Sequence, residues 1–218
     1  MVYLDIINEV LKNLREDEVA SSTSNTYSKL ISFFVKQAYI ETSNAYQWPQ
    51  LHETQDIAIT AGDTTAVITG DSGEGVYDIH SVYNVTDECF LRASNYKSIQ
   101  DKISSDTDQN KPSEYAYAGV SSAGSTINIY PTSDASYTLR VSYNRKPNLS
   151  NTFDDTTFIK VPSEVIILNA WSKAIAERGE DGGAQSNLVA MQAKEALSDA
   201  IALYESNNNS GNMDWNVV

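Results

Sequence analysis

The side chains best suited to catalysis or metal binding are few in this sequence and lie far apart along it. The two histidines are His52 and His80, and the single cysteine is Cys89. A cysteine beside a histidine can form a nucleophile with its base, but no flanking motif accompanies these residues. Nothing in the sequence places the two histidines together. We therefore expect no catalytic site at these positions.

Two pairs of carboxylates, Asp71 with Glu74 and Asp154 with Asp155, could bind a cation or share a proton. Both pairs lie in turn-rich polar stretches, where Asp is common because its side chain caps turns. The capping interpretation is the one we favour. The sequence also lacks a glycine-rich phosphate loop, an HExxH zinc motif and EF-hand spacing. We expect no catalytic residue, no bound metal and no cofactor.

The charge of the chain argues against a protein that wraps nucleic acid. Its 218 residues include 15 Lys or Arg and 29 Asp or Glu, which gives a formal net charge of −14. Nucleic-acid binding requires basic side chains that neutralise phosphates. The acidic balance suits a protein kept apart from others by its own charge. It equally suits a surface that DNA passes without binding, and the composition leaves both interpretations open.

The cysteine count and the hydropathy pattern restrict the compartment. A single cysteine excludes an intrachain disulfide and a cysteine-based metal cluster, so a reducing cytoplasm is the natural setting. Charges at Asp5, Glu9 and Lys12 interrupt the apolar core that a signal peptide needs. No apolar run approaches the roughly 20 residues of a membrane span. We expect neither a secretory leader nor a membrane contact.

The hydrophobic pattern of the chain changes twice, from helical to strand-like and back to helical. The first 52 residues are predicted to form two helices. Apolar residues recur at helical spacing in the first helix, namely Ile6, Ile7, Val10, Leu11 and Leu14. The second helix has the longest periodic pattern in the chain, from Tyr27 to Tyr46. We expect Thr23 or Ser24 to cap it. It should end at Gln47-Trp48-Pro49, because a residue before proline disfavours helical geometry.

From about residue 53 to 150 the pattern alternates with a period of two, which is typical of strands. Runs such as Ile57 with Ile59, and Leu139 with Val141, are separated by clusters of Gly, Asp, Ser and Pro. The region is predicted to form six to eight short antiparallel strands in a small sandwich or barrel. The polar segment 94–104 is expected to form a short helix packed outside, followed by a loop at 106–111.

Helical periodicity returns at Pro162, a residue suited to a first helical turn. One helix is expected around Trp171, with a break at 179–183. A second amphipathic helix should run from about 184 to 205, with Leu188, Met191, Leu197, Ile201 and Tyr204 on its apolar face. Neither the first pair of helices nor the last has an apolar face that is covered by itself, so the two pairs should pack together.

The predicted fold is therefore α+β, with an antiparallel β sandwich or barrel domain inserted into a four-helix unit. The domains are 1–52 with 151–206 for the helices, 53–150 for the inserted β domain and 207–218 for an extended tail. The core joining the helix pairs is expected to include Phe34, Trp48 and Trp171. In the tail, Met213, Trp215 and Val217 alternate along a polar segment. They are interface candidates, with Trp215 the expected hot spot of a strand added to a neighbouring sheet.

Tyrosine is unusually frequent, with 13 residues against 5 phenylalanines. Its ring can be buried while its hydroxyl stays hydrated, so tyrosines gather at protein interfaces and sugar-binding surfaces. Ordinary sheet pairing explains any one of them. As a population they favour an interaction protein over an enzyme.

The N-terminal residues resemble a known family. The run Ile7-Asn8-Glu9-Val10-Leu11-Lys12-Asn13-Leu14-Arg15-Glu16, the spaced residues from Tyr27 to Val35, and the ending Asn44-Ala45-Tyr46-Gln47-Trp48 are similar to the start of head-to-tail adaptor proteins of short-tailed bacteriophages. These are often called tail tubular protein A. The later order of elements agrees, with two C-terminal helices around Trp171 and Glu177-Arg178-Gly179. The resemblance covers the helical half of the chain. The β insertion matches only in its position along the chain and in its strand-like pattern.

The resemblance implies a structural virion protein made in the host cytoplasm. Twelve copies would form a dodecameric ring in the virion neck, between the portal protein and the tail nozzle protein. The ring would line the genome-ejection channel, through which DNA passes without specific binding, with no enzymatic activity, cofactor or membrane. The alternative is a carbohydrate-binding or adhesin-like β module on a helical stalk, which would use exposed Tyr and Trp side chains.

Overall fold

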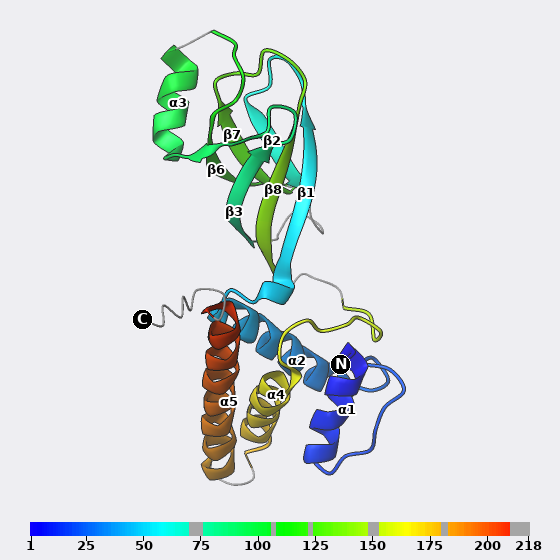
Figure 1. The fold of residues 1–218 in the computed structure, drawn as a ribbon. Coiled ribbons are helices and arrows are strands. Elements are labelled where there is room, and N and C mark those ends of the chain that lie inside the picture. Colours follow the sequence, from blue (N-terminus) through cyan, green and yellow to red (C-terminus); the bar gives the residue numbers. More distant parts are fainter. Residues whose placement is uncertain (70–75, 106–107, 122–123, 148–152, 180–182, 210–218) are drawn as a thin grey trace, which may run out of the picture. The chain divides into compact units, whose positions relative to one another are not determined.

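The computed structural model describes residues 1–218 except for 70–75, 106–107, 122–123, 148–152, 180–182 and 210–218. Within the described residues the chain has five α-helices and two four-stranded sheets (Figure 1). This is the α+β fold predicted from the sequence. The chain divides into two compact units, which we call the helical unit (Met1–Gln50 with Thr152–Val218) and the β unit (Leu51–Asn151).

The helical unit is built around its third helix. Its helices are α1 (Tyr3–Asn13), α2 (Thr26–Ala45), α4 (Ser163–Arg178) and α5 (Ala184–Asn209). Helix α4 packs against α1, α2 and α5 (Figure 1). Both α1 and α2 therefore need the C-terminal part of the chain to complete their burial, as the sequence predicted.

The start of α2 differs from the prediction that Thr23 or Ser24 caps it. Asn25 is the N-cap: its side chain accepts a bond from the backbone N–H of Ser28 at 2.6 Å. The Ser28 hydroxyl accepts one from the backbone N–H of Asn25 at 3.0 Å. This reciprocal capping box needs, three residues after the cap, a polar side chain that accepts a hydrogen bond from the backbone N–H of the cap residue. A cap at Ser24 would put Tyr27 there, and the Tyr27 hydroxyl instead accepts a hydrogen bond from Arg178.

The other helix ends follow local chemistry. After α2 the chain forms a short 3-10 turn, η1 (Pro49–Leu51). Helix α4 ends at Gly179, whose φ of +66° is a left-handed conformation that glycine adopts without strain. Helix α5 continues to Asn209, so the prediction of an extended tail from residue 207 is wrong for its first three residues. Each asparagine added to an existing helix gains a backbone hydrogen bond that offsets its modest intrinsic propensity.

The strands found among the described residues all belong to the β unit. They are β1 (His52–Ile59), β2 (Thr65–Thr69), β3 (Val76–Asn84), β4 (Cys89–Phe90), β5 (Arg92–Ala93), β6 (Glu114–Ser121), β7 (Gly124–Tyr130) and β8 (Tyr137–Lys146). One sheet has the order β1-β8-β3-β4 and the other β2-β7-β6-β5. Helix α3 (Tyr96–Ser105) is the short outer helix predicted at 94–104 and contacts β6 and β7.

One pairing departs from the predicted antiparallel arrangement. Strands β5 and β6 pair in parallel, with Arg92 opposite Glu114, while the other paired strands are antiparallel. The chain between these two strands passes through α3. A helical crossover of this kind returns a strand in the same direction, which a tight hairpin cannot do.

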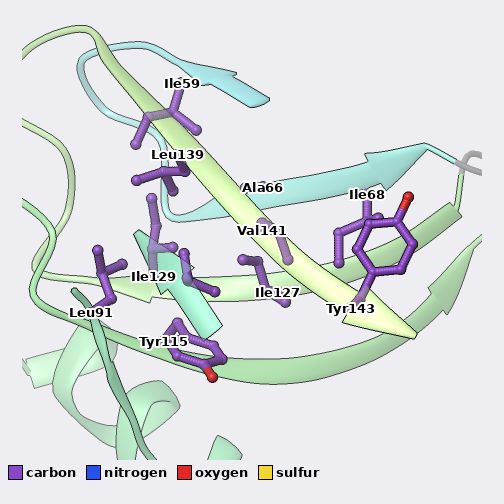
Figure 2. Packing of buried hydrophobic residues seen from close by; sticks show 11 residues of the cluster. Ile59, Ala66, Ile68, Leu91, Tyr115, Ile127, Ile129, Leu139, Val141 and Tyr143 are labelled. Carbon is purple, nitrogen blue, oxygen red and sulfur yellow. The ribbon is translucent and has the colours of Figure 1, made fainter. Parts of the chain in front are cut away.

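The core of the β unit lies between its two sheets (Figure 2). Ile127 and Ile129 of β7 face Leu139 and Val141 of β8, and all four side chains are fully buried. They are two residues apart on each strand because alternate side chains point to the same face. The remaining members come from both sheets as well: Ile59, Ala66, Ile68, Val82, Leu91, Tyr115 and Tyr143. The β unit is thus a sandwich whose two sheets cover each other.

Candidate interaction surfaces

The structure brings the two histidines together, contrary to the expectation that nothing does so. His52 on β1 and His80 on β3 flank β8, and their ring centroids lie 5.6 Å apart. His80 sits at a register shift between Ile79 and Ser81, which a period-two pattern cannot reveal. Cys89 pairs with Asn84, four residues further along β3 than His80. Among the described residues no hydrogen bond joins Cys89 to either histidine.

Of the aspartates at 154 and 155, Asp155 has a side-chain partner. Asp155 accepts a hydrogen bond from the backbone N–H of Ser22 at 3.1 Å. Hydrogen bonds from the side chains of Ser22 and Ser21 hold the pKa of Asp155 below its ordinary 3.8. Its carboxylate thus stabilises the turn before α2. Asp71 and Glu74 lie outside the described residues, within which no group of three His, Cys, Asp or Glu side chains could hold a metal ion.

The three residues predicted for the helical core occupy different environments. Trp48 is fully buried, and its indole N–H donates to the Thr42 carbonyl at 2.7 Å. Its ring packs edge-on against Tyr204 of α5, with centroids 5.2 Å apart. Trp171 is half-buried, and its Nε1 atom is buried without a partner among the described residues. Phe34 is also half-buried and packs near the ring of Phe33. The interface candidates Met213, Trp215 and Val217 lie outside the described residues.

Helix α5 has two apolar sides. One side is buried in the helical unit and includes Val189 and Ala193. The other side exposes Leu188, Met191 and Leu203, whose exposed fractions are 58%, 69% and 63%. The sequence placed Leu188 and Met191 on the same apolar face as Leu197 and Tyr204, which is wrong. Helical periodicity identifies apolar positions, but two apolar faces on one helix merge into one broad pattern.

The exposed side of α5 borders a groove with an acidic rim. We call it the acidic groove; it has a volume of about 590 Å³ and lies between α4 and α5. Leu168 of α4 and Leu203 of α5 contribute apolar surface, and Glu164, Glu195 and Asp199 contribute carboxylates. None of these three carboxylates forms an ion pair with another described residue.

Helix α2 carries a basic and apolar stripe on the side away from its buried residues. We call it the α2 stripe; its members, exposed or half-buried, are Lys29, Phe33, Lys36, Ile40 and Asn44. Phe33 is 45% exposed. The Lys36 ammonium lies 5.4 Å from the centre of the Phe153 ring, and its partial burial lowers the pKa of Lys36. The stripe combines positive charge with an exposed aromatic ring, a composition enriched at protein interfaces.

Three other cations of the helical unit form ion pairs within the chain. Lys12 pairs with Glu9 at 2.9 Å, and Lys173 pairs with Glu41 at 2.6 Å. Arg178 bonds both Glu16 and the Tyr27 hydroxyl. The contacts of Lys173 and Arg178 join α4 to α2 and to the segment after α1. Lys29 of the α2 stripe, in contrast, has no ion pair with any described residue.

Comparison with known protein families shows which family the chain belongs to. The family model described as SU10 adaptor protein matches residues 1–215. The chain belongs to this family. No curated protein matches the chain. The resemblance to phage head-to-tail adaptors, found in the N-terminal and C-terminal helices, is therefore confirmed and extends through the β unit.

Membership makes this adaptor a structural protein of bacteriophages and a virion component, which implies a non-enzymatic role. An adaptor works by oligomerising and by contacting portal and tail proteins in general. None of the helices among the described residues is long and apolar enough to cross a membrane. The family finding favours an adaptor over the alternative of a carbohydrate-binding module.

Proposed function

We propose that this adaptor forms a closed ring between the portal protein and the tail nozzle, and that the ring lines the genome-ejection channel. The observation that carries the proposal is the exposed apolar side of α5 in a chain that matches the adaptor family almost from end to end. Three large aliphatic side chains on one helix face are costly to leave in water. A neighbouring subunit removes them from water.

The number of copies proposed is twelve. The dodecamer comes from the resemblance of the sequence to tail tubular protein A, and the portal and nozzle follow from the same resemblance. The net charge of −14 supports a channel that does not hold DNA, because acidic side chains repel phosphates. Duplex DNA should therefore pass the ring without specific binding.

The last residues of the chain are proposed as an additional anchor to a neighbour. Met213, Trp215 and Val217 alternate, so in an extended strand their side chains share one face. An aromatic side chain on such a strand is a typical interface hot spot. Replacing Trp215 by Ala should weaken ring or portal association about tenfold, equivalent to about 1.4 kcal/mol, without changing the melting temperature. Association equal to that of the wild type would show that Trp215 does not anchor the chain to a neighbour.

Electron microscopy of the purified protein, alone and mixed with the portal protein, tests the proposed function. The expected result is closed rings of twelve copies, free or stacked coaxially on the portal. An electrophoretic shift assay at physiological salt should show no binding to duplex DNA. Particles that remain monomeric in the presence of portal, or micromolar and salt-sensitive DNA binding, would contradict the proposal.

A further inference from the structure

We infer that the ring is held together by a head-to-tail contact in which the α2 stripe of one copy docks in the acidic groove of the next. This inference rests on the proposed function, because it supplies the repeated contact that a ring requires. Its occupant is a second copy of this chain. Both surfaces belong to the helical unit and lie on different helices.

The two surfaces match in the spacing of their residues. The α2 stripe takes positions 29, 33, 36, 40 and 44, and the exposed side of α5 takes 188, 192, 195, 199 and 203. Both follow the same steps of four, three, four and four residues, which trace a nearly straight ridge along a helix. The fifteen steps from the first to the last position of each ridge extend about 22 Å. Two ridges of equal length can therefore lie side by side over four turns.

The two surfaces also match in charge. The α2 stripe contributes Lys29 and Lys36, and the acidic groove contributes Glu164, Glu195 and Asp199. The middle position of one ridge is Lys36 and the middle position of the other is Glu195. These two positions therefore face each other whether the helices run parallel or antiparallel, and Lys29 is the more exposed cation of the stripe. Apolar groups flank them, with Phe33 and Ile40 on one side and Leu188 and Leu203 on the other.

The net charge makes this complementarity necessary. Copies of a chain with net charge −14 repel one another, so self-association needs local pairing of opposite charges. A two-fold contact of the acidic groove with itself would bring Glu195 and Asp199 close to the same residues of the partner. Like charges in such contact oppose binding. A contact between two different surfaces avoids this repulsion, and repetition of such a contact generates a ring when the rotation between neighbours closes.

Two charge-reversed variants test the contact. In the first, Lys29→Glu and Lys36→Glu make the α2 stripe acidic; in the second, Glu195→Lys and Asp199→Lys make the groove basic. Each variant alone should need at least about a hundredfold higher concentration than the wild type to assemble, because like charges then face each other. A matched control, Lys97→Glu with Lys111→Glu, makes the same charge change at exposed residues of the β unit and should assemble as the wild type does.

Mixing the two variants is the decisive measurement. An equimolar mixture contains complementary surfaces at both contacts, so it should recover the wild-type mass in sedimentation or native mass spectrometry, with the two chains alternating. Circular dichroism should show each variant folded. Assembly of either variant at wild-type concentrations, or folded variants that stay monomeric when mixed, would overturn the contact. A wild-type chain that stays monomeric with portal would instead overturn the ring.

Discussion

The two units of this chain bury their apolar side chains to different degrees. In the β unit the inward residues of β7 and β8 are fully buried between two sheets (Figure 2). In the helical unit, α5 buries one side and exposes large aliphatic residues on the other. The β unit exposes some apolar residues too, but Phe90 lies on β4 and Val120 on β6, in separate sheets. A sandwich completes its own core, whereas the outer helix of this bundle offers a second apolar face to a partner.

The helical unit depends on one tryptophan, and its removal should have the largest effect. Trp48→Ala should lower the free energy of unfolding by about 3–5 kcal/mol, because it removes a fully buried ring between α2 and α5. Urea unfolding followed by circular dichroism measures the change. In Trp48→Phe a smaller aromatic ring remains but the bond to the Thr42 carbonyl is lost, so a cost of at least about 1 kcal/mol is expected. An unchanged urea midpoint in the alanine variant would refute the core assignment.

Truncation of a buried side chain in the β sandwich should lower stability without affecting assembly. Ile127→Ala leaves a cavity between the sheets and should cost about 2–5 kcal/mol. Where the variant is still folded, its ring mass should equal that of the wild type, since the proposed contacts lie in the helical unit. Val120→Ala, at an exposed position on β6, is the matched control and should change stability by less than about 0.5 kcal/mol. If folded Ile127→Ala failed to form rings, assembly would depend on the β unit as well as on the helical unit.

The exposed face of α5 should show the opposite behaviour. Met191→Ser with Leu203→Ser removes apolar surface that the isolated chain leaves in water. The melting temperature of the monomer should therefore stay nearly constant, while association weakens about tenfold, or about 1.4 kcal/mol. Sedimentation across a concentration series measures the shift. Unchanged association would mean that this face of α5 does not contact a partner.

The smallest effect is a pH dependence of the helical unit. Burial by itself raises the pKa of Glu41, but hydrogen bonds from Lys173 and Asn169 outweigh it and leave this pKa below 4.5. A lowered folded-state pKa stabilises the fold above the ordinary value and loses this contribution as the pH falls through the folded value. The exposed pair should contribute less than about 1 kcal/mol.

Melting curves of the wild type and Glu41→Gln from pH 7 to pH 3 test this dependence. The wild type should melt higher at pH 5–7, and the difference should shrink below pH 4.5. An equal difference at pH 3 and pH 7 would show that the ionised carboxylate of Glu41 has no stabilising role.

The sequence predicts the elements of this fold well because their signals are local. The stripe of α1 and the alternation in β7 and β8 are patterns of neighbouring residues, and they predict the helices and the inward side chains correctly. The parallel pairing of β5 with β6 depends on a crossover through α3, and short strands carry no mark of direction. The approach of His52 to His80 depends on a register shift and on the strand order β1-β8-β3, which only the folded sheet defines.

The interaction surfaces are harder to predict from sequence. The pattern in α5 contains Leu188, Met191 and Leu203, but it does not show that they point away from α4. The sequence also does not show which charged side chains form ion pairs. Glu41 pairs with Lys173, more than a hundred residues away, while Glu195 has no ion partner among the described residues. The family resemblance could be predicted, since it depends on local residue runs and their spacing in the helices.

Particles of the phage that encodes this chain provide the most direct test of a neck adaptor. A stop codon at position 48 should yield heads that contain DNA but carry no tail, seen by electron microscopy of lysates. Supplying the intact chain from a plasmid should restore tailed, infectious particles. Tailed and infectious particles made without the chain would contradict the account.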